Sequence, residues 1–226
     1  MEITADGRIM SRNSLFSYKC NICCKCCHGK GIQVNPYETM RLAECLGMST
    51  TDFRQKYLIN QFLRHKDNSD ACVFLQKTGC GVHRDRPLVC RLYPLGRARL
   101  ENGEEIFFRV NPHPESEGEY GQNSTVDQCL SSQDVEPFIR AENRYLDLIK
   151  KMASSVLDAK VEDNTQDSNS LLGTDHDSKW ILDPDPVIAR YCQLKGLEFP
   201  STAQNKLTIH LDALNAWIEG EWNPLS

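Results

Sequence analysis

The 226-residue sequence has no apolar run that approaches the roughly 20 residues of a membrane-spanning helix. Its first 30 residues also lack the apolar stretch of a signal peptide. Basic residues are not in excess, because 26 Lys and Arg stand against 31 Asp and Glu, which argues against nucleic acid as the main partner. We therefore expect a cytoplasmic protein whose partner or substrate is another protein. The sequence gives no indication of its oligomeric state.

Several catalytic signatures are also missing from the sequence. It contains no P-loop, no G-x-G-x-x-G, no G-x-S-x-G and no H-E-x-x-H. Histidine is scarce, with six residues, whereas cysteine is abundant, with eleven. If this chain binds metal, we therefore expect thiolates to supply the ligands.

Five cysteines stand within the eight residues from Cys20 to Cys27, in the order Cys-x2-Cys-Cys-x-Cys-Cys. Thiols this crowded cannot all form disulfides, since a bridge needs Cα atoms roughly 4.4–6.8 Å apart and adjacent cysteines seldom pair. An odd total leaves at least one thiol free, and thiols stay reduced in the cytosol. Clustered thiolates readily share metal ions, so the segment predicts a metal centre.

A second half of the centre has to come from elsewhere in the chain. Cys72, Cys80 and Cys90 are suited to it, because each stands at the edge of an expected element, and Cys129 follows a long polar segment. Eight thiolates could form two four-sulfur sites, or one cluster and a second metal site. The predicted metal ligands are Cys20, Cys23, Cys26, Cys27, Cys72, Cys80, Cys90 and Cys129.

The other candidate ligands are weaker. Cys24 is interpreted as a spare thiol, with a ligand role left open. Cys45 and Cys192 lie within expected helices among apolar neighbours, where cysteine behaves as a small hydrophobic residue. His83 and His28 are interpreted as hydrogen-bonding or surface residues. An arginine-rich stretch is interpreted as a solvated face that compensates thiolate charge, with recognition of an acidic or phosphate-bearing partner as the alternative. It consists of Arg84, Arg86, Arg91, Arg97 and Arg99.

Local patterns predict a mainly α protein of the α+β class, with a small β-hairpin and irregular cysteine-rich loops. The hairpin is expected around Asn102-Gly103, a strong turn signal between two apolar runs. A loop is expected over 111–127, a short buried strand or extended piece over 71–75 and a turn over 79–81. Helices are expected over 36–46, from 50 or 51 to about 62, over 87–93, 135–157 and 185–195, and from a cap at Ser201 to 218.

These elements suggest a metal-centred core followed by C-terminal helices. The expected divisions are a cysteine-cluster metal-binding domain at 10–130, a packing helix at 131–157, a flexible linker at 158–178 and a C-terminal helical segment at 179–226.

Three motifs taken together resemble a known family. They are Phe16-x3-Cys20-x2-Cys23-x2-Cys26-Cys27, then Cys72-Val-Phe-Leu, then Cys80-x2-His83-x2-Arg86-Pro-x2-Cys90-Arg-Leu-Tyr-Pro. Over residues 16–95 the chain is similar to the CxxCxxCC (YkgJ-like) cysteine-cluster family, a zinc- or iron-chelating domain related to flagellin lysine N-methylases. The resemblance implies metal chelation, and methyl transfer only through that relationship. This sequence departs from the pattern at Cys24, where a small residue is expected, and at His83, where an aromatic residue is common.

The metal stays open between an iron–sulfur cluster and zinc or mononuclear iron. Seven or eight crowded thiolates exceed the four that one zinc ion needs, which favours iron–sulfur. The role would be redox or structural, and the alternative is a protein-modifying enzyme of the lysine N-methylase type. Cys20-x3-Cys24-x2-Cys27 also matches the spacing of radical S-adenosylmethionine enzymes. We regard that match as accidental, because no alternating strands and helices accompany it.

Overall fold

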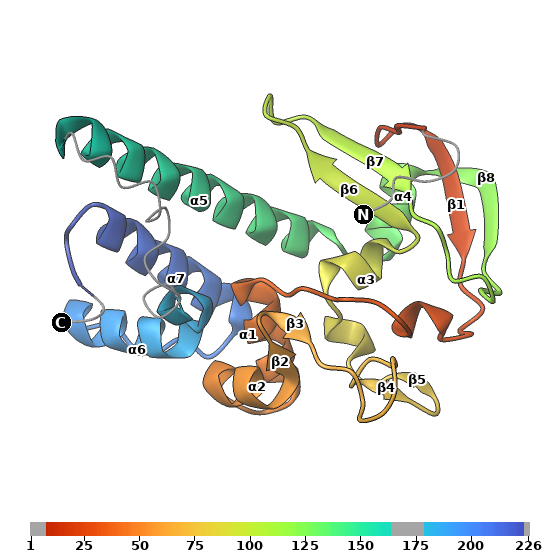
Figure 1. Ribbon diagram of the computed structural model, residues 1–226, viewed down its shortest axis with the longest axis horizontal. Coiled ribbons are helices and arrows are strands. Elements are labelled where there is room, and N and C mark those ends of the chain that lie inside the picture. Colours follow the sequence, from red (N-terminus) through yellow and green to blue (C-terminus); the bar gives the residue numbers. More distant parts are fainter. Residues whose placement is uncertain (1–7, 164–178, 224–226) are drawn as a thin grey trace. The chain divides into compact units, whose positions relative to one another are not determined.

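The computed structural model describes residues 8–163 and 179–223, and the chain divides into two compact units (Figure 1). Unit 1 comprises residues 1–33 and 62–139, and unit 2 comprises residues 34–61 and 140–226. The described residues contain seven α-helices and small antiparallel strand pairs, which confirms the α+β class. The consecutive segments expected at 10–130, 131–157, 158–178 and 179–226 stay a prediction. Most of the expected linker lies outside the described residues.

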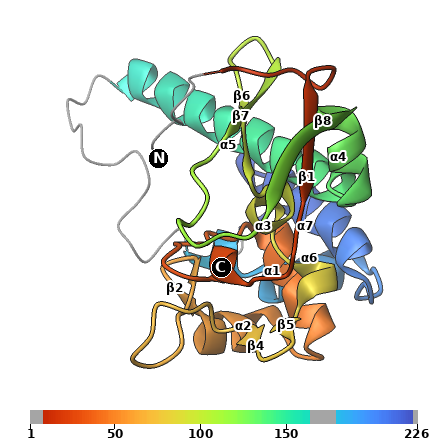
Figure 2. The same cartoon turned by 90° about the vertical axis from the view of Figure 1, so that its right-hand side faces the viewer.

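In unit 1, β1 (Leu15–Lys19) pairs antiparallel with β8 (Glu119–Thr125), as Figure 2 shows. Leu15 lies opposite Thr125, and Lys19 opposite Glu119. The loop predicted over 111–127 is therefore wrong for most of its second half. β8 is polar and has no regular apolar alternation, so its strand forms through pairing with a distant partner, which a local pattern does not reveal.

A hairpin of β6 (Leu95–Arg99) and β7 (Glu105–Arg109) confirms the turn predicted at Asn102-Gly103. Phe107 on β7 is completely buried. Its backbone exchanges two hydrogen bonds with Met10, of 2.8 and 2.9 Å, which adds the N-terminal segment to the edge of the hairpin.

Helix α4 (Val126–Ser132) follows β8 directly and starts with a capping box between Thr125 and Gln128. The chain before β1 is bound to this region through Arg12. Its guanidinium donates to three carboxylates at 2.7–2.9 Å, those of Glu105, Asp127 and Glu136. One side chain thus links the hairpin, α4 and the start of the next helix.

The remaining elements of unit 1 are short and carry or flank the cysteines. The strand or extended piece expected over 71–75 is found in part, because Ala71 and Cys72 form isolated β-bridges and a strand begins at Leu75. The turn expected over 79–81 is wrong, because Gly79 and Cys80 form a strand. These elements are η1 (Lys25–Cys27), β3 (Phe62–Leu63), β4 (Leu75–Gln76), β5 (Gly79–Cys80), η2 (His83–Asp85) and α3 (Leu88–Leu92).

Unit 2 contains α1 (Pro36–Cys45), α2 (Thr50–Tyr57) and β2 (Leu58–Ile59). The predicted start of α1 is confirmed, because Asn35 and Glu38 form a capping box around Pro36. The prediction that the second helix reaches about residue 62 is wrong, since α2 ends at Tyr57.

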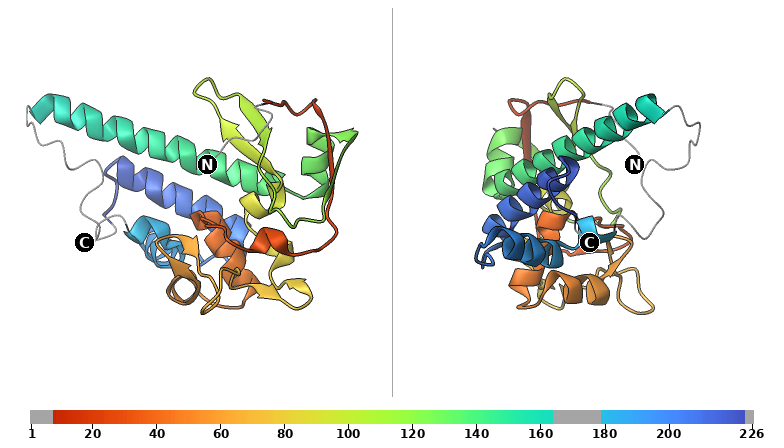
Figure 3. Two further views of the ribbon diagram at one scale, coloured as in Figure 1. Left: turned by 45° about the vertical axis from the view of Figure 1, so that its right-hand side comes forward. Right: turned by 90° about the vertical axis from the view of Figure 1, so that its left-hand side faces the viewer.

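The rest of unit 2 is helical. Helix α5 (Glu136–Asp163) begins in unit 1 and continues into unit 2, where η3 (Lys179–Leu182), α6 (Pro184–Lys195) and α7 (Ala203–Ile218) follow. Figure 3 shows α6 and α7 side by side, in blue. Gly196 ends α6 with φ 66°, as predicted. None of the described helices combines the length and the apolar character needed to cross a lipid bilayer.

The cap of α7 and its packing differ in detail from the prediction. Thr202, one residue after the predicted Ser201, accepts a hydrogen bond from the backbone N–H of Asn205. His210 on α7 is fully buried, and its Nδ1 lies 2.8 Å from the hydroxyl of Tyr145 on α5. The buried cluster at the end of unit 2 consists of Val187, Tyr191, Ala213, Ala216 and Trp222.

Candidate metal centre

The cysteine-rich segment leaves the end of β1 and makes one turn of 3-10 helix, η1. Ile22 and Cys24 have φ of 55° and 59°, in the left-handed region that non-glycine residues seldom adopt. Such residues cost of the order of 1–3 kcal/mol each and persist only where the surrounding structure imposes them. The two reversals keep the segment compact, so its thiols stay near one another.

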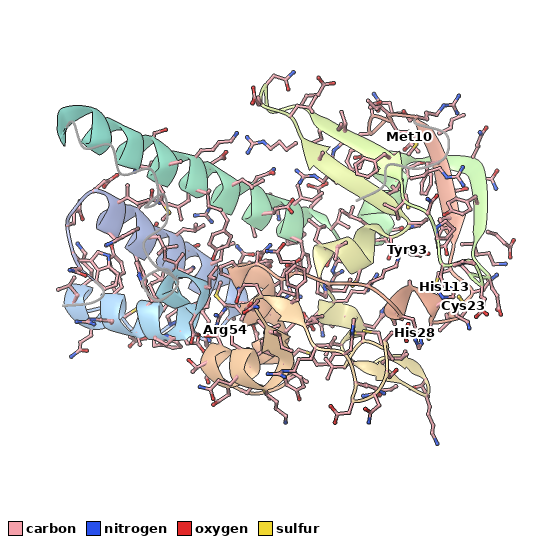
Figure 4. All side chains as sticks on the ribbon, viewed as in Figure 1. Met10, Cys23, His28, Arg54, Tyr93 and His113 are labelled. Atoms are coloured by element: carbon pink, nitrogen blue, oxygen red, sulfur yellow. The ribbon has the colours of Figure 1, made fainter. Side chains whose placement is uncertain are left out.

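A second segment is bound to the first through the backbone. The N–H of Cys72 donates to the carbonyl of Cys27 at 2.8 Å, and the N–H of Gly29 donates to the carbonyl of Asp70 at 3.0 Å. These bonds hold two stretches side by side that are more than 40 positions apart in the sequence. Figure 4 labels Cys23 and His28 at this end of unit 1, away from Met10.

Two further cysteines come from short regular elements. Cys80 lies on β5, opposite Leu75 on β4, and the hairpin is closed by a hydrogen bond of 2.8 Å from Gly81 N–H to the Phe74 carbonyl. Cys90 lies in the middle of α3. Both thiols are half-buried, as are those of Cys26, Cys27 and Cys72.

Arg91, next to Cys90, is not part of a solvated face. Only 4% of its surface is exposed, and its guanidinium lies 4.1 Å from the centre of the Phe138 ring. It donates to three backbone carbonyls, those of Arg84, Arg86 and Gln133. For this residue the sequence interpretation is wrong: Arg91 organises the loop before α3, because a planar guanidinium can satisfy several buried acceptors at once.

The position of Arg86 is consistent with its interpretation as a cation that compensates the charge of the thiolates. It donates to the carbonyl of His83 at 2.5 Å and to the side-chain oxygen of Gln133 at 2.6 Å. Burial raises the pKa of Cys80, and the charge of Arg86 opposes that rise. The hydrogen bond from Cys27 lowers the pKa of Cys26, and the charge of Arg86 adds to this lowering. A fixed positive charge beside thiols favours their thiolate form, which is the form that binds metal.

The thiols of Cys26 and Cys27 form a coupled pair. A hydrogen bond from Cys27 lowers the pKa of Cys26 to about 6, with a smaller contribution from Lys30, and the same bond raises the pKa of Cys27. The pKa of Cys27 is raised further by burial and by Cys80 and Cys72. Through the charge interactions of Cys27 with Cys72 and Cys80, the adjacent pair Cys26–Cys27 links the segment at residues 20–27 with the later cysteines.

Lys30 is a further cation of the centre, and sequence reasoning did not find it. Its Nζ lies 3.8 Å from the centre of the Tyr93 ring, and it is half-buried. Burial lowers the pKa of Lys30, while the thiolates of Cys26, Cys90 and Cys27 raise it. The signal in the sequence was a lysine between two glycines after the cluster, which is too common a pattern to interpret.

The His28–Asp70 pair was missed as well. Nδ1 of His28 lies 2.9 Å from Oδ1 of Asp70, and the hydrogen bond to His28 lowers the pKa of Asp70. Asp70 has no sequence feature that marks it. The pair therefore arises from the pairing of the two cysteine-bearing segments and could not be predicted from spacing.

The donors fit a thiolate-bound metal, although they do not yet form a coordination shell. Among the residues that the structure describes, no three Cys, His, Asp or Glu side chains converge closely enough to hold an ion. Cysteine sulfur lies about 2.3 Å from a bound zinc. Binding would therefore require these side chains to turn towards a common point. None of the eleven cysteines forms a disulfide, so no S–S bond prevents the clustered thiols from doing this.

Charge interactions connect most of the predicted ligands. After burial, the charges of Cys20, Cys23 and Cys26 raise the pKa of Tyr18. The charges of Cys72 and Cys80 contribute to the raised pKa of Cys27. The charge of Cys90 acts on the pKa of Lys30, as do those of Cys26 and Cys27. Cys129, on α4, differs: burial alone raises the pKa of its thiol. Its ligand role is untested, as are the roles of the other seven.

The two cysteines assigned to the core have different outcomes. Cys192 is 3% exposed, which confirms its assignment. Cys45 is exposed at the last residue of α1, so its assignment to the core is wrong. The apolar neighbours in sequence lie on the opposite face of the helix.

Residues 19–113 match the model of the CxxCxxCC family, whose description is "Putative zinc- or iron-chelating domain". No curated protein matches the chain. No solved structure matches it either. The match covers every cysteine from Cys20 to Cys90 and leaves out Cys129 and unit 2 beyond residue 113. Residues 19–113, which contain seven of the eight predicted metal ligands, are similar to the CxxCxxCC family of zinc- or iron-chelating domains.

Proposed function

We propose that unit 1 binds metal through its clustered thiolates and that the metal is an iron–sulfur cluster, with zinc or mononuclear iron as the alternatives. One observation supports this most: the backbone hydrogen bond of 2.8 Å from Cys72 N–H to the Cys27 carbonyl joins two cysteine-bearing segments, and the charges of Cys72 and Cys80 raise the pKa of Cys27 there, after Cys26 and burial. Like charges placed together are unfavourable unless a cation is present among them.

The number of thiols supports a cluster over a single zinc ion. One structural zinc needs four ligands, and the interacting set is larger. Lys30 and Arg86 would compensate the excess negative charge that a multi-thiolate centre carries. A half-buried environment of this kind is also where the reduction potential of a cluster can be adjusted by charge and hydrogen bonding.

The proposed role is redox or structural. A structural centre would hold together a region in which the regular elements are only two to five residues long. Short elements bury little apolar surface, so the metal–sulfur bonds would contribute folding free energy directly. Lysine N-methylation gains no support from any contact among the described residues, and we do not propose it.

The test is metal analysis, with an electronic spectrum, of the full chain purified without exposure to air. Iron with acid-labile sulfide and visible charge-transfer absorption would support the cluster, whereas stoichiometric zinc without colour would support a structural zinc centre. Folded protein that contains neither metal, and takes up neither, would contradict the proposal. Cys23→Ser and Cys90→Ser should lose metal, and Cys192→Ser, whose thiol is buried on α6 of unit 2, should keep it.

A further inference from the structure

The stretch around Cys72 pairs with the chain on both of its sides. On one side, Ala71 forms an antiparallel bridge with His28. Next to this bridge, the N–H of Cys72 donates to the carbonyl of Cys27 at 2.8 Å. On the other side, Cys72 itself forms an antiparallel bridge with His65. Cys72 is thus the middle position of a small ladder, between the cysteine segment and a histidine.

The bridge between His65 and Cys72 is of the kind that brings side chains closest together. Hydrogen bonds donated by the N–H groups of Lys66 and Val73, of 2.8 and 3.0 Å, flank the pair on either side. Residues opposite each other in such a non-hydrogen-bonded pair have Cα atoms about 4.5 Å apart and side chains on the same face. The register therefore puts the imidazole of His65 on the same face as the thiol of Cys72.

A backbone carbonyl orients the ring of His65. Its Nε2 lies 3.0 Å from the carbonyl oxygen of Lys30, three residues after Cys27. A carbonyl oxygen only accepts, so the proton of this hydrogen bond is on Nε2, and the lone pair of the neutral ring is on Nδ1. Histidines that bind metal almost always donate their other ring N–H to a carbonyl or a carboxylate in this way. The contact therefore prepares Nδ1 of His65 as a donor to a metal ion.

Two other histidines near the cysteines are less suitable. His28 is bridged to Ala71, and neighbouring residues of an extended chain point to opposite faces, so His28 and Cys72 lie on different faces of the ladder. Nδ1 of His83 lies 3.3 Å from Nη1 of Arg86, whose permanent charge would repel a metal ion. Only His83 of these is suggested by spacing, through Cys80-x2-His83, whereas His65 lies outside every cysteine motif.

We propose that His65 is a nitrogen ligand of the metal centre, next to the thiolate of Cys72. This rests on the proposed function, since it adds a ligand to the same metal. Neutral imidazole binds both zinc and iron, and on an iron–sulfur cluster a histidine in place of a cysteine raises the reduction potential. As with the thiols, the described side chains would have to converge further to complete a coordination shell. The hydrogen bond to the Lys30 carbonyl would be kept, because it uses the other ring nitrogen.

The matched variants are His65→Gln and His83→Gln, each purified as the full chain without air beside the unaltered protein. Both histidines are exposed residues of unit 1, so the two substitutions remove the same group from comparable positions. Competition with a chelator measures the affinity for zinc and for iron. A third variant, His65→Cys, offers sulfur in place of nitrogen. Its cobalt(II) form is compared with that of the unaltered protein, because thiolate-to-cobalt charge-transfer absorption increases with the number of sulfur ligands.

We expect His65→Gln to lower the metal affinity by at least about tenfold, since even the loss of a group that only orients a ligand costs roughly 10–100-fold. His83→Gln should equal the unaltered protein. His65→Cys should recover affinity and gain charge-transfer absorption per cobalt ion. A histidine that only stabilised the fold would give no such gain.

His65→Gln that binds metal as tightly as the unaltered protein overturns the inference while the proposed function stands, and so does His65→Cys without additional charge-transfer absorption. Unaltered protein that takes up no metal overturns both. If His65→Gln does not fold, diethyl pyrocarbonate, which acylates accessible imidazole nitrogens, decides on the unaltered protein. Metal should protect His65 and leave His83 reactive, and equal modification of His65 with and without metal would refute the assignment.

Discussion

The ammonium group of Lys30 lies 3.8 Å from the centre of the Tyr93 ring, on the border of the thiol cluster. Removal of this charge should weaken metal binding, because the thiolates of Cys26, Cys90 and Cys27 lose a compensating cation. We expect Lys30→Met to lower the affinity for metal about tenfold, as for other groups that support metal ligands. Competition with a chelator measures this. Lys30→Arg should restore most of the affinity.

The control for Lys30→Met is Lys77→Met, which removes the same charge from an exposed position in unit 1. Equal affinities in Lys30→Met and the unaltered protein would show that the Lys30 charge does not act on the metal. An equal loss in both variants would mean that only the net charge of the unit matters.

Arg91→Lys should destabilise unit 1 by at least about 2 kcal/mol, because a lysine cannot serve all three carbonyls and leaves buried acceptors without donors. Denaturant unfolding followed by circular dichroism would measure the loss. Arg84→Lys is the matched control, since the Arg84 side chain is exposed. Similar unfolding midpoints for the two variants would contradict the anchoring role of Arg91.

The buried His210 should make unit 2 sensitive to acid. Burial lowers the pKa of His210 from 6.5 to about 3, so the folded state binds fewer protons than the unfolded state between these values. Stability attributable to this group is present above pH 6.5 and is lost as the pH falls, by about 1.4 kcal/mol per pH unit. The loss should begin near pH 6.5 and level off near pH 3.

His210→Gln should keep a polar partner for Tyr145 and remove this proton-linked loss. Urea unfolding followed by tryptophan fluorescence reports on unit 2, because all three tryptophans lie there. We expect the stability difference between His210→Gln and the unaltered protein to shift in favour of the variant as the pH falls from 7 to 5. His113→Gln, in unit 1, should leave the pH dependence unchanged. A stability difference independent of pH would contradict the prediction.

The N-cap of α7 offers a direct comparison of two adjacent hydroxyls. Thr202→Ala should cost about 1 kcal/mol of stability, since the Thr202 side chain accepts from Asn205 N–H. Ser201→Ala should cost little, because Ser201 lies one residue too early to cap the helix. Thermal unfolding of both variants checks this, and the opposite ranking would restore the assignment made from sequence.

Local signals in the sequence predicted the helices best. The Asn35-Pro36 start, the Gly196 end and the Asn102-Gly103 hairpin were all found, because each depends on neighbouring residues. β8 was missed because it forms through its pairing with β1. The exposure of Cys45 was missed because successive side chains of a helix point in different directions, so apolar neighbours in the sequence do not show that a residue is buried.

In the candidate centre too, features that depend on neighbouring residues were predicted, and features that depend on distant residues were not. Spacing and the dense cysteine motif predicted a metal centre and the family, and residues 19–113 match that family. Spacing could not show which thiols are neighbours, since Cys72 is brought to Cys27 by a backbone hydrogen bond between distant segments. Nor could it identify Lys30 and Asp70, whose positions depend on the same long-range pairing.

The hydrogen bond from Cys72 to Cys27 has a consequence for biosynthesis. Translation produces Cys27 first, and at 5–20 residues per second roughly a few seconds pass before Cys72 exists. During that interval the five thiols of residues 20–27 leave the ribosome without the segment that later lies beside them. The newly made chain therefore depends on the reducing power of its surroundings before its own fold can shelter these sulfurs.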